Sequence, residues 1–194
     1  TNVVVIWLSA AVLFCCTCMA VPLMHLVPLI QGRGVSAPEA GSVLFVMLIA
    51  AIFGRVAFGK LADMIGAIPA YMAASLWQTV LVFVFTQINS LDMLYVFAPI
   101  YGFGYAGVMT GLLITIRALT PVSRRAGATG IVLAFAWLGH GLGGYQGGLF
   151  FDLTGAYTLS FANAALAGIL NLLIVGALFV TIRRQRAAPA QATR

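Results

Sequence analysis

Six apolar runs, each long enough to cross a lipid bilayer, dominate the sequence. A bilayer core of about 30 Å needs about 20 apolar residues for one helical crossing. Long apolar stretches such as residues 76–85 do not alternate as strands of a membrane barrel do. Because lipid offers the backbone no hydrogen-bond partners, each run is predicted to be a helix. The predicted helices cover residues 3–30, 39–58, 67–87, 91–116, 127–151 and 157–182.

The composition excludes a soluble domain. Hydrophobic residues make up 62% of the 194 and charged residues only 7%, whereas soluble domains carry roughly 25% charged residues. The linkers are too short to hold a soluble domain of their own. We therefore predict an all-α membrane protein with six transmembrane helices in one domain, residues 1–182, followed by a basic cytoplasmic tail, residues 183–194.

The basic residues orient the predicted bundle. Short loops rich in lysine and arginine stay in the cytoplasm, and Arg33 is the only basic residue on the opposite side. Both termini are therefore expected in the cytoplasm, with the protein in the plasma membrane, the inner membrane of a bacterium. The net charge of +6 is read as this topology signal, and no nucleic-acid partner is expected. The residues on the basic side are Lys60, Arg117, Arg124, Arg125, Arg183, Arg184 and Arg186, with Arg55 close by.

Neither a metal nor a cofactor is expected. Cys15, Cys16 and Cys18 fall inside the first predicted helix, without the further ligands that a zinc or copper site needs. We interpret them as small packing residues. All four carboxylates lie at helix ends or in a loop, which argues against a cation site or a proton relay in this chain. They are Glu39, Asp63, Asp92 and Asp152.

Glycines crowd the fourth and fifth predicted helices. Residues 102–107 fit the G-x-G-x-x-G nucleotide fingerprint, but that fingerprint requires a preceding strand and a soluble βαβ unit. We reject it in favour of close helix packing, which small residues at four-residue spacing allow in lipid. An additional hinge role is compatible with packing. The glycines of the fifth helix are Gly139, Gly141, Gly143, Gly144, Gly147 and Gly148.

Arg55 is the leading candidate for a substrate-binding residue. An arginine inside a span costs roughly 2.5 to 3.5 kcal/mol at the helix centre, so it usually faces a partner or a watery cavity. Its planar fork holds a carboxylate through two parallel hydrogen bonds, which favours an anionic substrate. The alternative is that Arg55, about one turn from Gly59, extends to the cytoplasmic interface or forms a structural ion pair.

Several other polar residues are candidates for lining the same site. His25 lies between Pro22 and Pro28, which bend or unwind a helix, and broken helices line transporter sites. A bond from His25 to a neighbouring helix is the alternative. His140 in the fifth helix offers a donor to a carboxylate. Weaker candidates, each of which also fits a packing or interfacial role, are Trp137, Tyr105, Gln146 and Gln78.

Two loops resemble those of a known transporter family. Residues 59–66 read GKLADMIG and resemble the G-x-L-A-D-R-x-G-R-R loop of the major facilitator superfamily, although Met64, Ala67 and Ile68 replace its basic residues. Residues 147–157 resemble the turn between the last two helices of that family. The resemblance implies the carboxyl-terminal half of a twelve-helix fold, built from two inverted three-helix units.

The resemblance also implies an amino-terminal partner half. The chain begins at Thr1, directly before apolar sequence, and we expect six further helices upstream. A complete six-helix protein acting as a dimer is the alternative. The family loop, whose matching residues include Gly59, Asp63 and Gly66, implies a conformational gate. In this gate Asp63 caps the third helix and pairs with Arg124 or Arg125 across the cytoplasmic face.

Residues 51–59 are similar to the eighth helix of monocarboxylate transporters and oxalate/formate exchangers. Arg55 falls where that family places an arginine that binds the substrate carboxylate, and His140 lies near the position of a substrate-binding lysine in the oxalate exchangers. Animal members carry an aspartate one turn before the arginine, where this chain has Ala51. That difference argues against proton symport.

These observations lead to one functional hypothesis and two alternatives. We expect a secondary active transporter half that moves small organic anions, such as monocarboxylates, by alternating access. Its expected partners are the anion, the amino-terminal half and the lipid bilayer. A receptor or assembly subunit without transport is the first alternative. An intramembrane hydrolase using Ser75 and His140 is the second, but no nucleophile elbow is present, so no enzyme is expected.

Overall fold

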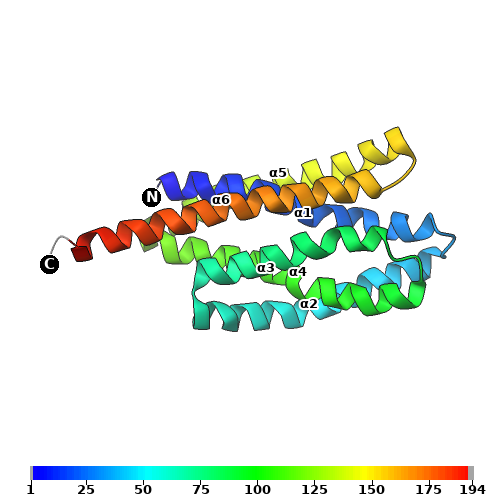
Figure 1. Cartoon of the computed structure of the whole chain (residues 1–194), viewed down its shortest axis with the longest axis horizontal. Helices are drawn as coiled ribbons and strands as arrows, with labels where there is room; N and C mark the ends of the chain where they lie inside the picture. The colour runs from blue at the N-terminus through cyan, green and yellow to red at the C-terminus, as the bar shows by residue number, and fades with distance from the viewer. Residues whose placement is uncertain (1, 192–194) are drawn as a thin grey trace.

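The computed structural model describes residues 2–191 and is helical throughout its ordered elements (Figure 1). Six of its helices are long and apolar enough to cross a membrane. The predicted all-α membrane fold is therefore confirmed. The helices are α1 (Asn2–Gln31), α2 (Ala37–Ile65), α3 (Ala67–Val82) with the short 3-10 turn η1 (Phe83–Thr86), α4 (Leu91–Leu119), α5 (Val122–Thr154) and α6 (Thr158–Gln191).

Several helices extend beyond the apolar runs that predict them. The α2 helix continues past residue 58 to Ile65, and α5 begins at Val122 instead of residue 127. Of the predicted cytoplasmic tail, residues 183–191 belong to α6, and residues 192–194 lie outside the described part of the chain. The physical reason is that polar residues end the apolar run but not the helical backbone, which continues into water.

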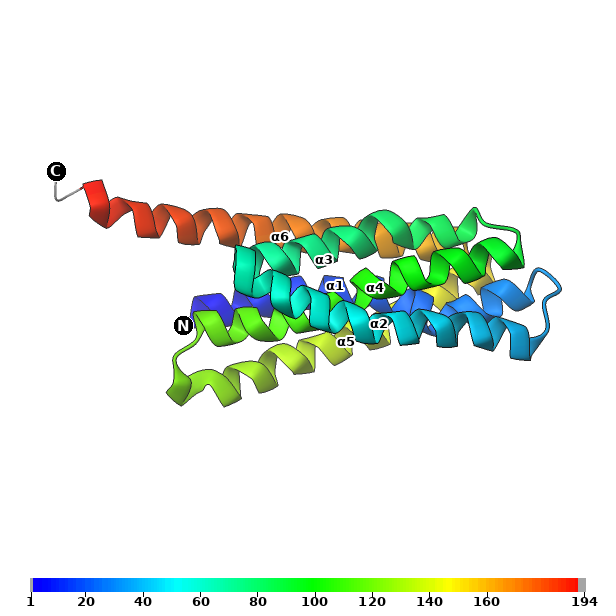
Figure 2. The same cartoon turned by 90° about the horizontal axis from the view of Figure 1, so that it is seen from below.

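The six helices form two interlocked units of three. The α2 helix packs along α4 of the second unit, and α5 packs along α1 of the first, so each unit's second helix lies against the other unit's first. The α3 and α6 helices contact each other and cover one side of α1 and α4. Figure 2 shows α3 and α6 along one side of the bundle, α2 and α5 along the other, and α1 and α4 between them.

Glycines on α4 allow its neighbours to approach closely. Gly102 and Gly107 face α2, and Gly104 and Gly111 face α3. A Cβ atom added at any of these four positions lies closer than 3.0 Å to the neighbouring helix, a distance that real Cβ atoms do not reach. The glycines of residues 102–107 therefore pack helices together, as small residues do in membrane bundles.

The glycines of α5 divide into two groups. Gly139, Gly143, Gly144 and Gly147 lie against α1, where an added Cβ meets backbone or side-chain atoms of that helix. Gly141 and Gly148 have open space where a side chain would extend. The packing interpretation therefore applies to one stripe of α5 and not to all of its glycines.

Arg33 fastens the linker between α1 and α2 to the end of η1. Its guanidinium donates hydrogen bonds to the carbonyl oxygens of Phe85 at 3.1 Å and Thr86 at 3.2 Å, and also to that of Ile88. Cations stabilise helix carboxyl ends because the last carbonyls there have no partners within the helix. Burial lowers the pKa of the Arg33 guanidinium from its ordinary value.

We expect replacement of Arg33 by leucine to destabilise the protein by about 1 to 3 kcal/mol, because three carbonyl oxygens lose a charged donor. Arg33→Lys recovers only part of that loss, since one ammonium does not reproduce the planar fork. The midpoint of thermal unfolding of the purified protein in detergent measures the effect. Gln31→Leu, at an exposed position in the same segment, is the matched control. Equal midpoints for Arg33→Leu and this control contradict the fastening role.

Candidate functional site

Arg55 lies on α2 with its side chain exposed. The side chain makes no hydrogen bond or ion pair with any residue in the described range 2–191. Its neighbour Gly54 faces α4, where the α2 backbone meets that of Phe103. Arg55 therefore flanks the stripe by which α2 packs on α4.

The position of Tyr105 on α4 indicates on which side of the α2–α4 contact Arg55 lies. Residues two positions apart on a helix point to nearly opposite sides, and Phe103 packs against Trp77 of α3, with 6.1 Å between the ring centroids. Tyr105 consequently points away from α3. It is half-buried and lies near Cys16 of α1 and the positive charge of Arg55. Arg55 and Tyr105 thus lie together on the side of the bundle that is opposite α3.

His140 occupies a corresponding position on α5. Gln146 and His140 lie on opposite flanks of the glycine stripe that packs on α1, given the helical repeat of 3.6 residues. Gln146 bonds to residues of α6, so His140 points away from α6. The half-buried His140 ring has Nδ1 3.0 Å from the carbonyl oxygen of Ala136, and its centroid lies 5.4 Å from the ring centroid of Trp137. Trp137 is 74% exposed.

Four of the predicted site residues therefore share one side of the bundle. We call this side the α2/α5 face and define it by Arg55, Tyr105, Trp137 and His140. Three of these residues belong to α2 and α5, and the fourth, Tyr105, belongs to α4. An arginine, a phenol hydroxyl, an imidazole and an indole together offer hydrogen-bond donors and one permanent positive charge. That set of groups suits an anion.

The structure places Gln146 and Gln78 elsewhere. The Gln146 side chain accepts a hydrogen bond from Asn163 Nδ2 at 3.1 Å and donates to the carbonyl oxygen of Ser160 at 3.4 Å, both on α6. Gln78 is fully buried and donates to Cys15. Both glutamines therefore join helices of this bundle. Sequence reasoning did not single out Asn163, which is, like Asn171, a polar residue within the otherwise apolar run of α6.

His25 is also engaged between helices. Its Nε2 lies 2.9 Å from the carbonyl oxygen of Gly144 on α5. Its ring centroid lies 5.3 Å from that of Tyr157, and Gly147 makes room for the imidazole. The interpretation in which His25 bonds to a neighbouring helix thus describes this structure, although α1 continues unbroken through Pro22 and Pro28.

The predicted gate residues are not brought together. Asp63 lies exposed within the last turn of α2, and the residue that precedes α3 at its amino end is Gly66, with a φ of 97°. Asp63 is therefore not the cap of α3. Arg124 donates to Asn2 Oδ1 at 3.5 Å, and Arg125 donates to the carbonyl oxygen of Arg117 at 3.0 Å. Neither arginine pairs with Asp63: α2 packs chiefly along α4, whereas α5 packs chiefly along α1.

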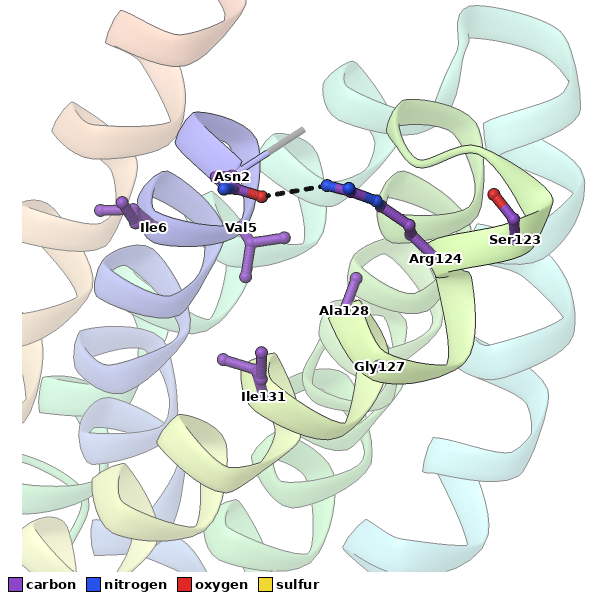
Figure 3. Close-up of a pocket in the computed structure, with 8 residues that line it drawn as sticks. All are labelled: Asn2, Val5, Ile6, Ser123, Arg124, Gly127, Ala128 and Ile131. Atoms are coloured by element: carbon purple, nitrogen blue, oxygen red, sulfur yellow. Dashed lines mark hydrogen bonds between the residues drawn. The ribbon is translucent and has the colours of Figure 1, made fainter.

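A pocket of about 560 Å³ opens at the basic end of the bundle, between the beginnings of α1 and α5. Figure 3 shows the Arg124 side chain extending across it toward Asn2. The polar lining residues are Asn2, Ser123 and Arg124, and the rest of the lining is apolar or glycine. The lining residues are Asn2, Val5, Ile6, Ser123, Arg124, Gly127, Ala128 and Ile131.

No metal-binding group is assembled in the described part of the chain. Residues 2–191 contain no cluster of three or more histidine, cysteine or acidic side chains that could hold an ion. Cys15, Cys16 and Cys18 are buried free thiols, which agrees with their interpretation as packing residues.

Two interlocked three-helix units of membrane-crossing length define an integral membrane protein. Comparison with known families makes this specific, because the model of the Major Facilitator Superfamily matches residues 6–194. The chain belongs to that superfamily.

Among the curated proteins, the chain is similar to "Monocarboxylate transporter 13" of Rattus norvegicus. The two are 31% identical over 147 residues, which cover 74% of this chain and 34% of the relative. The chain thus spans about a third of the length of that relative. The predicted resemblance to the monocarboxylate transporters of the superfamily is confirmed.

Proposed function

We propose that this chain is the carboxyl-terminal half of a secondary active transporter that moves small organic anions, monocarboxylates or related dicarboxylates, by alternating access. The observation that carries the proposal is Arg55, which lies on the α2/α5 face without an acidic partner in residues 2–191. The name of the rat relative, a monocarboxylate transporter, supports the same class of substrate.

The proposed binding chemistry starts from the cost of the Arg55 charge. A guanidinium surrounded by low-dielectric material attracts a counter-ion strongly, and a carboxylate matches its fork with two parallel hydrogen bonds. Tyr105, within electrostatic range of Arg55, offers a hydroxyl donor. His140, stacked against Trp137, offers an imidazole on the other edge of the same face. A small carboxylate held by these groups replaces the missing acidic partner.

The proposed transport cycle needs a second half over the α2/α5 face. The α2 and α5 helices bury only a narrow stripe each and leave much of their apolar surface uncovered. In transporters of this superfamily, two such halves enclose a central site and rock about it. We propose that an amino-terminal six-helix half covers this face. The basic ends of the helices then lie in the cytoplasm of a bacterial cell, following the positive-inside rule.

Substrate flux in proteoliposomes tests the proposed function. We expect the reconstituted full-length transporter to take up radiolabelled lactate, formate or oxalate with saturation, and to do so faster when the same unlabelled anion is loaded inside. Uncharged glycerol is the control solute and should enter no faster than into empty liposomes. Binding of the anions without flux favours the receptor alternative, and neither binding nor flux contradicts the proposed substrate class.

A further inference from the structure

A second polar cluster lies away from the α2/α5 face, where α1, α3 and α6 meet. Its α3 members follow a spacing of four and then three residues, which places them on one side of that helix. All five of its side chains are fully buried. We call them the α1/α3/α6 cluster: Cys15, Tyr71, Ser75, Gln78 and Asn171.

Direct hydrogen bonds satisfy only part of this cluster. The Tyr71 hydroxyl donates to Asn171 Oδ1 at 2.9 Å. Gln78 Nε2 donates to the carbonyl oxygen of Cys15 at 3.4 Å and approaches its Sγ at 3.3 Å. Three buried polar atoms then have no partner within the described residues: Ser75 Oγ, Gln78 Oε1 and Asn171 Nδ2.

These atoms are expensive to leave unpaired. A buried polar group without a hydrogen bond costs about 1 to 3 kcal/mol, and lipid around a transmembrane bundle supplies no compensating partner. The Cys15 thiol lies beside Tyr71 and Ser75, but sulfur is a weak donor and a weak acceptor. The protein alone therefore does not satisfy the cluster.

The chemistry of the three atoms selects what binds there. Gln78 Oε1 only accepts, Asn171 Nδ2 only donates, and Ser75 Oγ does either. A cation is repelled by the amide N–H group of Asn171, and an anion is repelled by the carbonyl oxygen of Gln78. We propose that the α1/α3/α6 cluster is a binding site for an ordered water molecule, which donates to Gln78 and Ser75 and accepts from Asn171. Buried waters make about three such bonds.

The proposed water joins the two three-helix units. Ser75 and Gln78 belong to α3 of the first unit, and Asn171 belongs to α6 of the second. Gln78 also contacts α1, so the water completes a polar joint among three helices. Its position away from Arg55 makes it a structural site separate from the proposed anion site.

The sign of the stability change in Ser75→Ala tests this inference. If the hydroxyl bonds to a water, its removal lowers the midpoint of thermal unfolding of the purified protein by about 2 to 4 °C. If the site is dry, removing an unpaired hydroxyl and adding a better helix former raises the midpoint. A raised or unchanged midpoint therefore overturns the proposal.

A double-mutant comparison covers the case in which Ser75→Ala acts through packing alone. Gln78→Met removes the second proposed water ligand while keeping the side-chain length. If both residues bond to one water, the two substitutions together lower the midpoint by less than the sum of their separate effects. Additive effects overturn the proposal. Ser160→Ala, which removes a buried hydrogen bond to Gly147 about three turns from Asn171 along α6, is the control and should remain additive with Ser75→Ala.

Discussion

Replacement of Arg55 by glutamine is expected to reduce the uptake of small carboxylates by at least about tenfold. The reason is that hydrogen bonds to charged groups contribute about 1.5 to 3 kcal/mol, and each 1.4 kcal/mol corresponds to a factor of ten in affinity. Glutamine keeps a hydrogen-bond donor but loses the charge and the fork. Arg55→Lys keeps the charge and loses the fork, so its uptake should lie between that of the wild type and that of Arg55→Gln. Initial rates in proteoliposomes, at matched protein content and over a range of substrate concentrations, measure both effects.

Lys60→Gln is the matched control for this experiment. Lys60 is an exposed basic residue on α2, about one turn further toward the basic end of the bundle. Its replacement removes a positive charge near the membrane surface without touching the α2/α5 face, and uptake should stay within about twofold of the wild type. If Arg55 instead extends to the interface as Lys60 does, both glutamine variants will transport equally well. That result removes Arg55 from the proposed site.

Solvation made the fold predictable from the sequence. Lipid forces the backbone to satisfy its own hydrogen bonds, so the six apolar runs translate directly into helices. The helix ends did not follow from the same argument. Lys60 and Asp63 end an apolar run, yet α2 continues through both to Ile65, because charged residues are compatible with a helix that leaves the bilayer.

The candidate site was harder to predict because sequence gives the depth of a residue better than the direction it faces. Gln146 and His140 are close in the chain, but one bonds to α6 and the other points away from it. His25 lies near two prolines, yet its imidazole is bonded to α5. The direction of each side chain depends on which helices become neighbours, and that choice follows from packing across the whole bundle.

The expected pairing of Asp63 with Arg124 or Arg125 illustrates the same limit. All three residues belong to the same end of the bundle, and opposite charges at one end suggest a contact. The interlocked arrangement instead packs α2 along α4 and α5 along α1. Knowledge of which end a residue occupies is therefore insufficient to predict an ion pair.

Glycine-mediated packing leads to the second large effect, at Gly54. We expect Gly54→Ala to destabilise the protein by about 1 to 3 kcal/mol or more, the usual cost of overpacking. The new methyl group would overlap the carbonyl group of Phe103, and a backbone atom in the middle of α4 does not move aside as a flexible side chain does. The thermal midpoint should fall, with about 2 to 4 °C for each kcal/mol in a chain of this size.

Gly41→Ala separates this packing effect from helix propensity. Gly41 lies on the same helix with no atom within 4 Å of an added Cβ, so alanine there should gain about 0.5 to 1 kcal/mol from its better helix propensity. The two substitutions are chemically identical and differ only in what the methyl group meets. Opposite shifts of the midpoint therefore measure the contact between α2 and α4. If both variants become more stable, α2 and α4 do not approach each other closely at Gly54 and Phe103.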